Sequence, residues 1–203
     1  MKHVEQACHD FFDGVHTAIT RHDLQRIAER AAHAMGFRWF AYFGRRADAP
    51  MWISSYPKSW TDHYSDQQYQ DVDPVLKRAA APCRSFLWDG REARAARSVR
   101  ERRLFDDALT LKIRTGVTVP ITAGYGRSAA FTLAVDDRSP GLDRLVENAT
   151  ALLQLVCLTY HAHGDAQVSG VLLPVHANFA LTTAGRQCLS WEHRATAGAA
   201  DAA

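Results

Sequence analysis

Two apolar, strand-like segments lie close together in the second half of the chain, Gly116–Ile121 and Ala129–Val135. The stretch between them contains the turn-forming sequence Ala-Gly-Tyr-Gly at 123–126. Strands joined by a tight turn pair in the antiparallel sense, and such a sheet must bury its apolar face under other elements. This hairpin constrains the fold most, because the rest of the chain must be arranged to cover it.

The remaining segments alternate between helical and strand-like spacing. Helical periodicity predicts helices before and after the strands, and dense apolar or aromatic runs predict further strands. A helix-start signal, Asp73 as N-cap followed by Pro74, opens the second of two short helical pieces in 57–82. The expected helices are 4–19, 23–35, two pieces in 57–82, 99–111, and 139 to about 161, and the expected strands are 37–43, 51–56, 85–88, 116–121 and 129–135. The order predicts an α+β fold with a central antiparallel sheet of about five strands and helices on both faces.

Composition excludes several classes of protein. The 203 residues are 47% hydrophobic and 23% charged, which is ordinary for a soluble globular protein, and the length fits one domain with a tail or two small domains. A net charge of +2 is far from the basic balance that indicates nucleic-acid binding, and the arginine-rich run 91–103 is typical of a solvated helix face. Neither a signal peptide nor a membrane-spanning run is visible, so we expect a cytoplasmic protein without membrane contact. The four cysteines are scattered, which argues against a zinc site and a disulfide framework.

Aromatic and polar residues gather between positions 52 and 88. Tyr56, Trp60 and Tyr64 are spaced four apart, and Asp73 and Trp88 follow closely. Rings with N–H and O–H donors, together with one carboxylate, suit a pocket for a ligand with a polar head and an apolar tail. On spacing alone, an aromatic core with Asp73 as a plain N-cap is the more common arrangement. Both interpretations stay open at this level.

A longer ordered pattern changes that balance. Its parts are Ala41-Tyr42, Tyr56-Pro-Lys-Ser-Trp60, Tyr64, Asp73-Pro74-Val75, Phe86-Leu87-Trp88, Gly116-Val-Thr-Val-Pro-Ile121 and Phe131-Thr132. In this order and at these intervals, the chain resembles the autoinducer-binding domain of LuxR-type quorum-sensing regulators across most of residues 37–135. The resemblance implies an α-β-α sandwich that holds an N-acyl homoserine lactone between the sheet and the helices of 57–82. It implies no other cofactor.

The resemblance also assigns roles to individual residues. Trp60 is expected to donate to the lactone carbonyl, Asp73 to accept the ligand's amide N–H, and Tyr56 to donate to the acyl carbonyl. Trp88 is expected to pack against the lactone. The other expected neighbours of the ligand are Phe105 and Ala108 on the same wall, Tyr64 and Ala41 along the acyl chain, and Thr132 near the acyl carbonyl.

The chain departs from the family pattern in two places. Thr110-Leu111-Lys112 replaces a turn that often contains glycine, so Lys112 is expected in a conformation that glycine prefers. Leu181–Trp191 resembles the opening helix of the family's helix-turn-helix, and only residues 192–203 follow. We therefore expect a ligand-binding domain at 1–163, a linker at 164–180 and an incomplete DNA-binding module at 181–203, with DNA bound only if that module were complete.

Other functions have weaker support. His161 and His163 do not share a helix face, so a metal site with Asp165 is not expected. The glycine-rich stretch 123–128 lacks the Gly-Lys-Ser/Thr ending of a phosphate loop, and no Gly-x-Ser-x-Gly elbow occurs, so no enzyme is expected. The resemblance implies pairing through the long helix at 139–161, in a homodimer or, as an alternative, in an inactive heterodimer with a full-length paralogue.

Overall fold

The structure is a computed structural model, and it describes residues 2–45, 51–81, 84–91, 98–122, 128–137 and 140–169. Twelve helices and strands occur in this part of the chain. They are α1 (Lys2–Thr17), α2 (Arg21–Ala34), β1 (Trp39–Arg45), β2 (Met51–Ser54), α3 (Lys58–Asp66), the 3₁₀ turn η1 (Tyr69–Asp71), α4 (Pro74–Ala80), β3 (Phe86–Asp89), α5 (Val99–Thr110), β4 (Thr115–Thr122), β5 (Ser128–Val135) and α6 (Pro140–Ser169).

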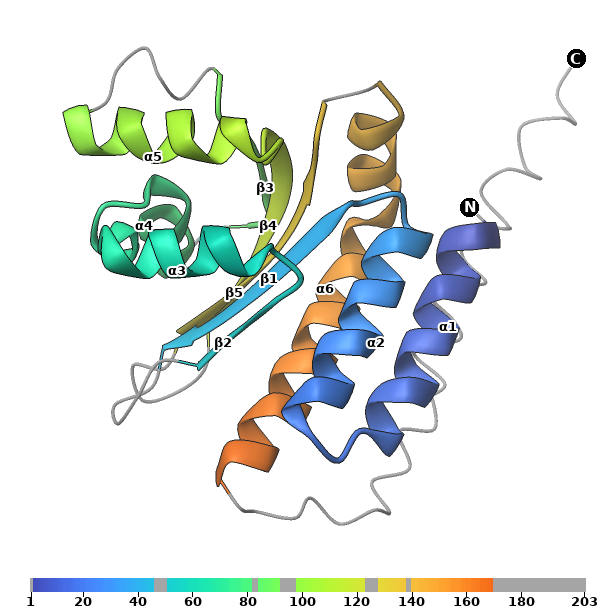
Figure 1. The fold of residues 1–203 in the computed structure, drawn as a ribbon. Helices are drawn as coiled ribbons and strands as arrows, with labels where there is room; N and C mark the ends of the chain where they lie inside the picture. Colours follow the sequence, from blue (N-terminus) through green and yellow to red (C-terminus); the bar gives the residue numbers. More distant parts are fainter. Residues whose placement is uncertain are drawn as a thin grey trace, which may run out of the picture. The chain divides into compact units, whose positions relative to one another are not determined.

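The five strands form one sheet in the order β2-β1-β5-β4-β3, and every neighbouring pair is antiparallel. Helices α1, α2 and α6 cover one face, whereas α3, α4 and α5 lie on the other (Figure 1). The predicted α+β fold, with helices on both faces of an antiparallel sheet, is confirmed.

Local sequence signals explain where several helices begin. Thr20 and Asp23 form a capping box at the start of α2, and Ser98 and Glu101 form one at the start of α5. In each box the hydroxyl accepts from a backbone N–H of the first turn, and the carboxylate accepts from the cap's own N–H. Asp73 caps α4, and Pro74 occupies its first position, as the sequence predicts.

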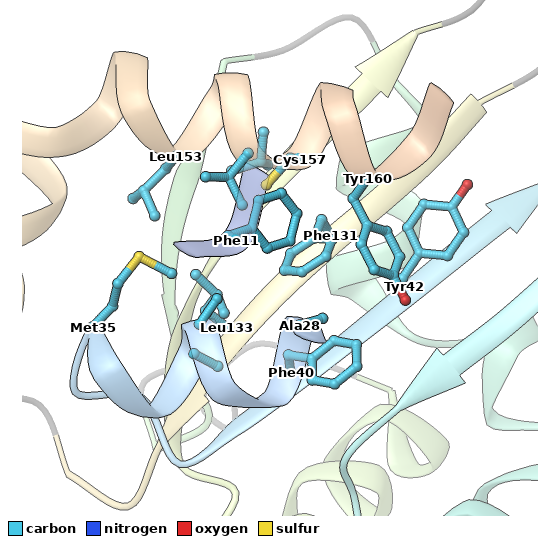
Figure 2. Packing of buried hydrophobic residues seen from close by; sticks show 14 of the residues in the cluster. Phe11, Ala28, Met35, Phe40, Tyr42, Phe131, Leu133, Leu153, Cys157 and Tyr160 are labelled. Carbon is cyan, nitrogen blue, oxygen red and sulfur yellow. The ribbon is translucent and has the colours of Figure 1, made fainter. Parts of the chain in front are cut away.

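The larger core fills the layer between the sheet and the helices α1, α2 and α6 (Figure 2). The rings of Phe40, Phe131 and Tyr160 meet here, with Phe131 and Tyr160 at 5.2 Å between centroids. Cys8 and Cys157 are free and buried in the same cluster. The packing of this layer supports one face of the sheet, and the opposite face is free to line a cavity.

Some boundaries differ from the sequence prediction. The expectation that the last helix ends near His161 is wrong, because α6 continues to Ser169, and the residues at 164–169 that were expected to begin a linker are helical. Gly164 does not stop the helix. It lies buried beside Met51, whose Cε would be 3.0 Å from an added Cβ, so the missing side chain serves close packing. The described elements up to Ser169 belong to one compact unit.

Several other expectations concern single residues, and some concern residues that the structure does not describe. Lys112 has φ +61°, the conformation expected from the missing glycine. Arg100, Arg102 and Arg103 are exposed on α5, as expected of a solvated face. Within the described ranges, no helix is both long and apolar enough to cross a bilayer. The turn expected at 123–126, Cys83, Cys188, and the linker and helix-turn-helix remnant from 170 onward lie outside the described residues.

Candidate functional site

A cavity lies between the sheet and the layer formed by α3, α4 and α5. It has an empty volume of about 640 Å³, part of which is open to solvent. Strands, helices and the segments between them all contribute to its wall. The lining residues are Ala41, Phe43, Trp52, Tyr56, Trp60, Tyr64, Asp73, Val75, Leu76, Trp88, Leu104, Phe105, Ala108, Ile113, Ala130 and Thr132.

Short side chains line the middle of the cavity floor, as the strand register shows. Ala41 of β1 lies opposite Thr132 of β5, which lies opposite Thr118 of β4. Residues directly opposite each other in an antiparallel sheet have side chains on the same face, so these three short side chains form one row. The row leaves space above the centre of the sheet that a row of large residues would fill.

The indole of Trp88 lies against the sheet at one end of the cavity. It fits there because its neighbour in the register is Gly116: a Cβ at Gly116 would be 2.7 Å from Cζ2 of Trp88. The indole Nε1 donates to Oγ1 of Thr118 at 3.1 Å, and Thr118 shares a 2.9 Å hydrogen bond with Thr132. Trp88 is therefore held in one orientation, and the Thr132 hydroxyl belongs to a short polar chain.

Asp73 is the acidic group of the cavity. Its Oδ1 accepts from the backbone N–H groups of Val75 at 2.7 Å and Leu76 at 3.4 Å, and its Oδ2 accepts from the Tyr64 hydroxyl at 2.8 Å. Enclosure within the fold raises the pKa of Asp73 above its ordinary value, while these hydrogen bonds and Lys77 oppose the rise. The carboxylate caps α4 and also lines the cavity, so the two roles coexist.

Two potential donors lie in the same wall as Asp73. Burial, together with the charge of Asp73, raises the pKa of Tyr56, so its phenol stays protonated and can donate. Trp60 of α3 is 4% exposed, and its ring meets those of Tyr64 and Tyr69 at centroid distances of 5.8 and 6.4 Å. These contacts restrict the indole and leave its N–H as a fixed potential donor.

Asp107 of α5 links α3 and η1, which belong to the helical layer above the cavity. Its Oδ2 lies 2.7 Å from Nε2 of His63 on α3 and accepts from the Tyr69 hydroxyl at 2.6 Å. Burial would raise the pKa of Asp107, but the hydrogen bonds from His63 and Tyr69 outweigh it and lower the pKa. The cluster holds α3, η1 and α5 in register, and with them Trp60, Phe105 and Ala108.

Every residue that the sequence prediction assigned to a ligand lies in the wall of this one cavity. The predicted set of ligand neighbours did not include several other residues that line the cavity, which are Phe43, Trp52, Val75, Leu76, Leu104, Ile113 and Ala130. The alternation of β1 and β5 could have indicated Ala130, because it is two residues from Thr132 and shares its face.

For the rejected metal site, Nδ1 of His161 lies 2.6 Å from the Tyr42 hydroxyl, and among the described residues no group of three potential ligands occurs.

Comparison with known proteins agrees with this geometry. The model of the family described as "Autoinducer binding domain" matches residues 20–165, which is most of the chain. The chain belongs to this family. The autoinducer-binding domain includes the whole sheet and all the residues that line the cavity. The sequence-based resemblance to it is confirmed.

Several relatives are transcriptional activators by name, in agreement with the expectation of a domain that is not an enzyme. The activator TraR of Rhizobium radiobacter is 33% identical over 125 residues, which cover 62% of this chain and 53% of TraR. SolR of Ralstonia solanacearum is 27% identical over 201 residues, covering 90% of this chain and 78% of SolR. The chain thus spans about half the length of TraR.

Solved structures support the fold. CepR2 from Burkholderia cenocepacia, described as an N-acylhomoserine lactone dependent LuxR family transcription factor, superposes with a TM-score of 0.71 at 23% identity, covering 82% of this chain and 98% of that one. SdiA of Escherichia coli gives a TM-score of 0.64 at 13% identity, covering 93% and 78%. At these identities, the likeness concerns the fold of the domain.

Proposed function

We propose that this autoinducer-binding domain binds an N-acyl homoserine lactone in the cavity between the sheet and α3–α5. The observation that carries the proposal is the enclosed carboxylate of Asp73, which is oriented by three hydrogen bonds and lines a cavity with the potential donors Tyr56 and Trp60. A ligand with one amide N–H and two carbonyl groups complements one acceptor and two donors.

Each side chain has a specific role in this proposal. Asp73 accepts the amide N–H of the ligand, Trp60 donates to the lactone carbonyl, and Tyr56 donates to the acyl carbonyl, near which Thr132 also lies. Trp88, held by Gly116 and Thr118, packs against the lactone ring, while Phe105 and Ala108 complete that wall. The acyl chain extends past Ala41 and Tyr64.

The energies favour recognition of the head group. A hydrogen bond to a charged group contributes about 1.5–3 kcal/mol, and a buried polar group without a partner costs about 1–3 kcal/mol. A molecule that lacks the amide N–H would leave the ligand-facing acceptor position of the enclosed carboxylate without a donor. The polar groups therefore select the lactone amide, and the apolar wall contributes affinity in proportion to the chain it covers.

The same proposal places the domain in a cytoplasmic receptor that forms dimers. Leu155 and Leu158 support a partner surface, because these two large apolar residues on α6 are 42% and 51% exposed. A second copy of the domain is the partner we propose. The antagonist role in a heterodimer stays a prediction.

Mass spectrometry of small molecules retained by the purified protein tests the proposal. Protein produced with a mixture of N-acyl homoserine lactones should retain one of them, whereas Asp73→Asn and Trp60→Phe should each retain about 10–100-fold less, in line with a lost hydrogen bond to a charged or buried group. Asp62→Asn is the matched control, because Asp62 pairs with Lys58 on the outer side of α3. Equal retention by all four proteins would overturn the proposal.

A further inference from the structure

The cavity floor changes character along β1 and β2. In the row of Ala41, the register partners on β2 and β5 are Ser54 and Thr132, and these three side chains are short. Two residues further along, Phe43 of β1 lies opposite Trp52 of β2. Both rings line the cavity and meet edge to face, with centroids 5.9 Å apart. Over β1 and β2 the floor thus passes from short side chains to two large rings, while Ala130 lies opposite Phe43 on β5.

Trp52 also spans the gap between the sheet and the helical layer. Its ring packs edge to face on the ring of Tyr64 in α3, at a centroid distance of 4.8 Å. Tyr64 in turn is fixed by its hydrogen bond to Asp73. The indole is therefore braced between Phe43 on the sheet and Tyr64 on the helix, and it forms a wall across one end of the cavity.

We propose that Trp52 ends the acyl-chain channel and restricts this domain to short, straight acyl chains of about hexanoyl length. The inference rests on the proposed function. Rows on one face of a strand lie roughly 7 Å apart, a distance that an extended chain covers in about five carbon–carbon bonds. A chain whose carbonyl lies over Ala41 and which extends along β1 therefore meets the wall of Phe43 and Trp52 near its sixth carbon.

The indole N–H makes Trp52 a favourable position for a test. Nε1 of Trp52 is buried and has no hydrogen-bond partner within the described part of the chain. Removing the indole therefore leaves no protein acceptor unpaired, and the substitution acts mainly through the space it opens.

Competitive retention from an equimolar mixture of butanoyl to dodecanoyl homoserine lactones, measured by mass spectrometry, tests the inference. Wild-type protein should prefer hexanoyl. Because each added buried methylene contributes about fourfold in binding, Trp52→Ala should raise the ratio of decanoyl to hexanoyl by at least about tenfold. Trp52→Phe keeps a ring at the wall, so its ratio should stay within about fourfold of wild type.

Phe43→Ala opens the same wall from the sheet side and should shift the ratio in the same direction, which keeps the test decisive if Trp52→Ala does not fold. Unchanged preference in variants that still retain a lactone would overturn the inference and leave the proposed function standing. Failure of wild type and all variants to retain any lactone would instead overturn the proposed function.

Discussion

Replacing Gly116 by alanine should disturb the cavity through the backbone. A Cβ at this position would lie 2.4 Å from the carbonyl oxygen of Leu133 and 2.7 Å from Cζ2 of Trp88. The first contact is with backbone in the neighbouring strand β5, so the strands must separate locally. The second displaces the indole and with it the hydrogen bond to Thr118. Overpacking costs about 1–3 kcal/mol and a hydrogen bond about 0.5–1.5 kcal/mol.

We therefore expect Gly116→Ala to lower the free energy of unfolding by about 2–4 kcal/mol, measured by urea denaturation followed by circular dichroism, and to reduce lactone retention. Gly14→Ala is the control, because its Cβ would meet side-chain atoms of Ile27 at 3.2 Å and no backbone atom of a neighbouring strand, and alanine favours the helix. Its free energy of unfolding should change by less than about 1 kcal/mol. If Gly116→Ala matched this control in both stability and retention, the argument from close packing would be refuted.

Three further predictions concern the carboxylates of the domain. Because burial raises the folded-state pKa of Asp73, the protonated form is favoured, and stability should fall as pH rises from the ordinary aspartate value through the raised one. Ligand binding uses the carboxylate, so retention measured against pH should fall as pH is lowered through the same range, and a flat profile would contradict this role. Tyr64→Phe removes a hydrogen bond that lowers the pKa of Asp73, so the midpoint of that profile should move to higher pH; a downward shift would contradict the geometry. Asp107→Ala removes the acceptor shared by His63 and Tyr69 and should lower the free energy of unfolding by about 1–3 kcal/mol, measured by urea denaturation. An unchanged free energy of unfolding would mean that these hydrogen bonds do not stabilise the packing of α3, η1 and α5.

Residues that sequence reasoning placed correctly carry strong local signals. Asp73 followed by Pro74 is a strong signal for a helix start, and the apolar run around Thr132 indicates a strand. The ordered pattern of Tyr56, Trp60 and Trp88 then indicated a shared site, and the structure brings these side chains into one cavity wall. Their binding role remains a prediction.

The residues that were missed depend on register and packing. Trp52 lies on a short strand whose alternation does not show which face is inward, since a slip of one residue exchanges the two faces. Gly116 appeared in the sequence pattern, but the need for glycine there is visible only once Trp88 lies across it. The continuation of α6 past Gly164 was missed because the packing partner of this glycine, Met51, is distant in sequence.

The central claim is that Asp73 accepts the amide N–H of the ligand, and a double-mutant cycle between protein and ligand tests it most directly. Affinities of wild type and Asp73→Asn are measured by titration calorimetry for hexanoyl homoserine lactone and for its ester analogue, in which oxygen replaces the amide N–H. We expect the ester to bind wild type about 100-fold more weakly, because the enclosed carboxylate loses its donor, and the difference to fall below about tenfold in Asp73→Asn. An equal loss in both proteins would contradict the claim.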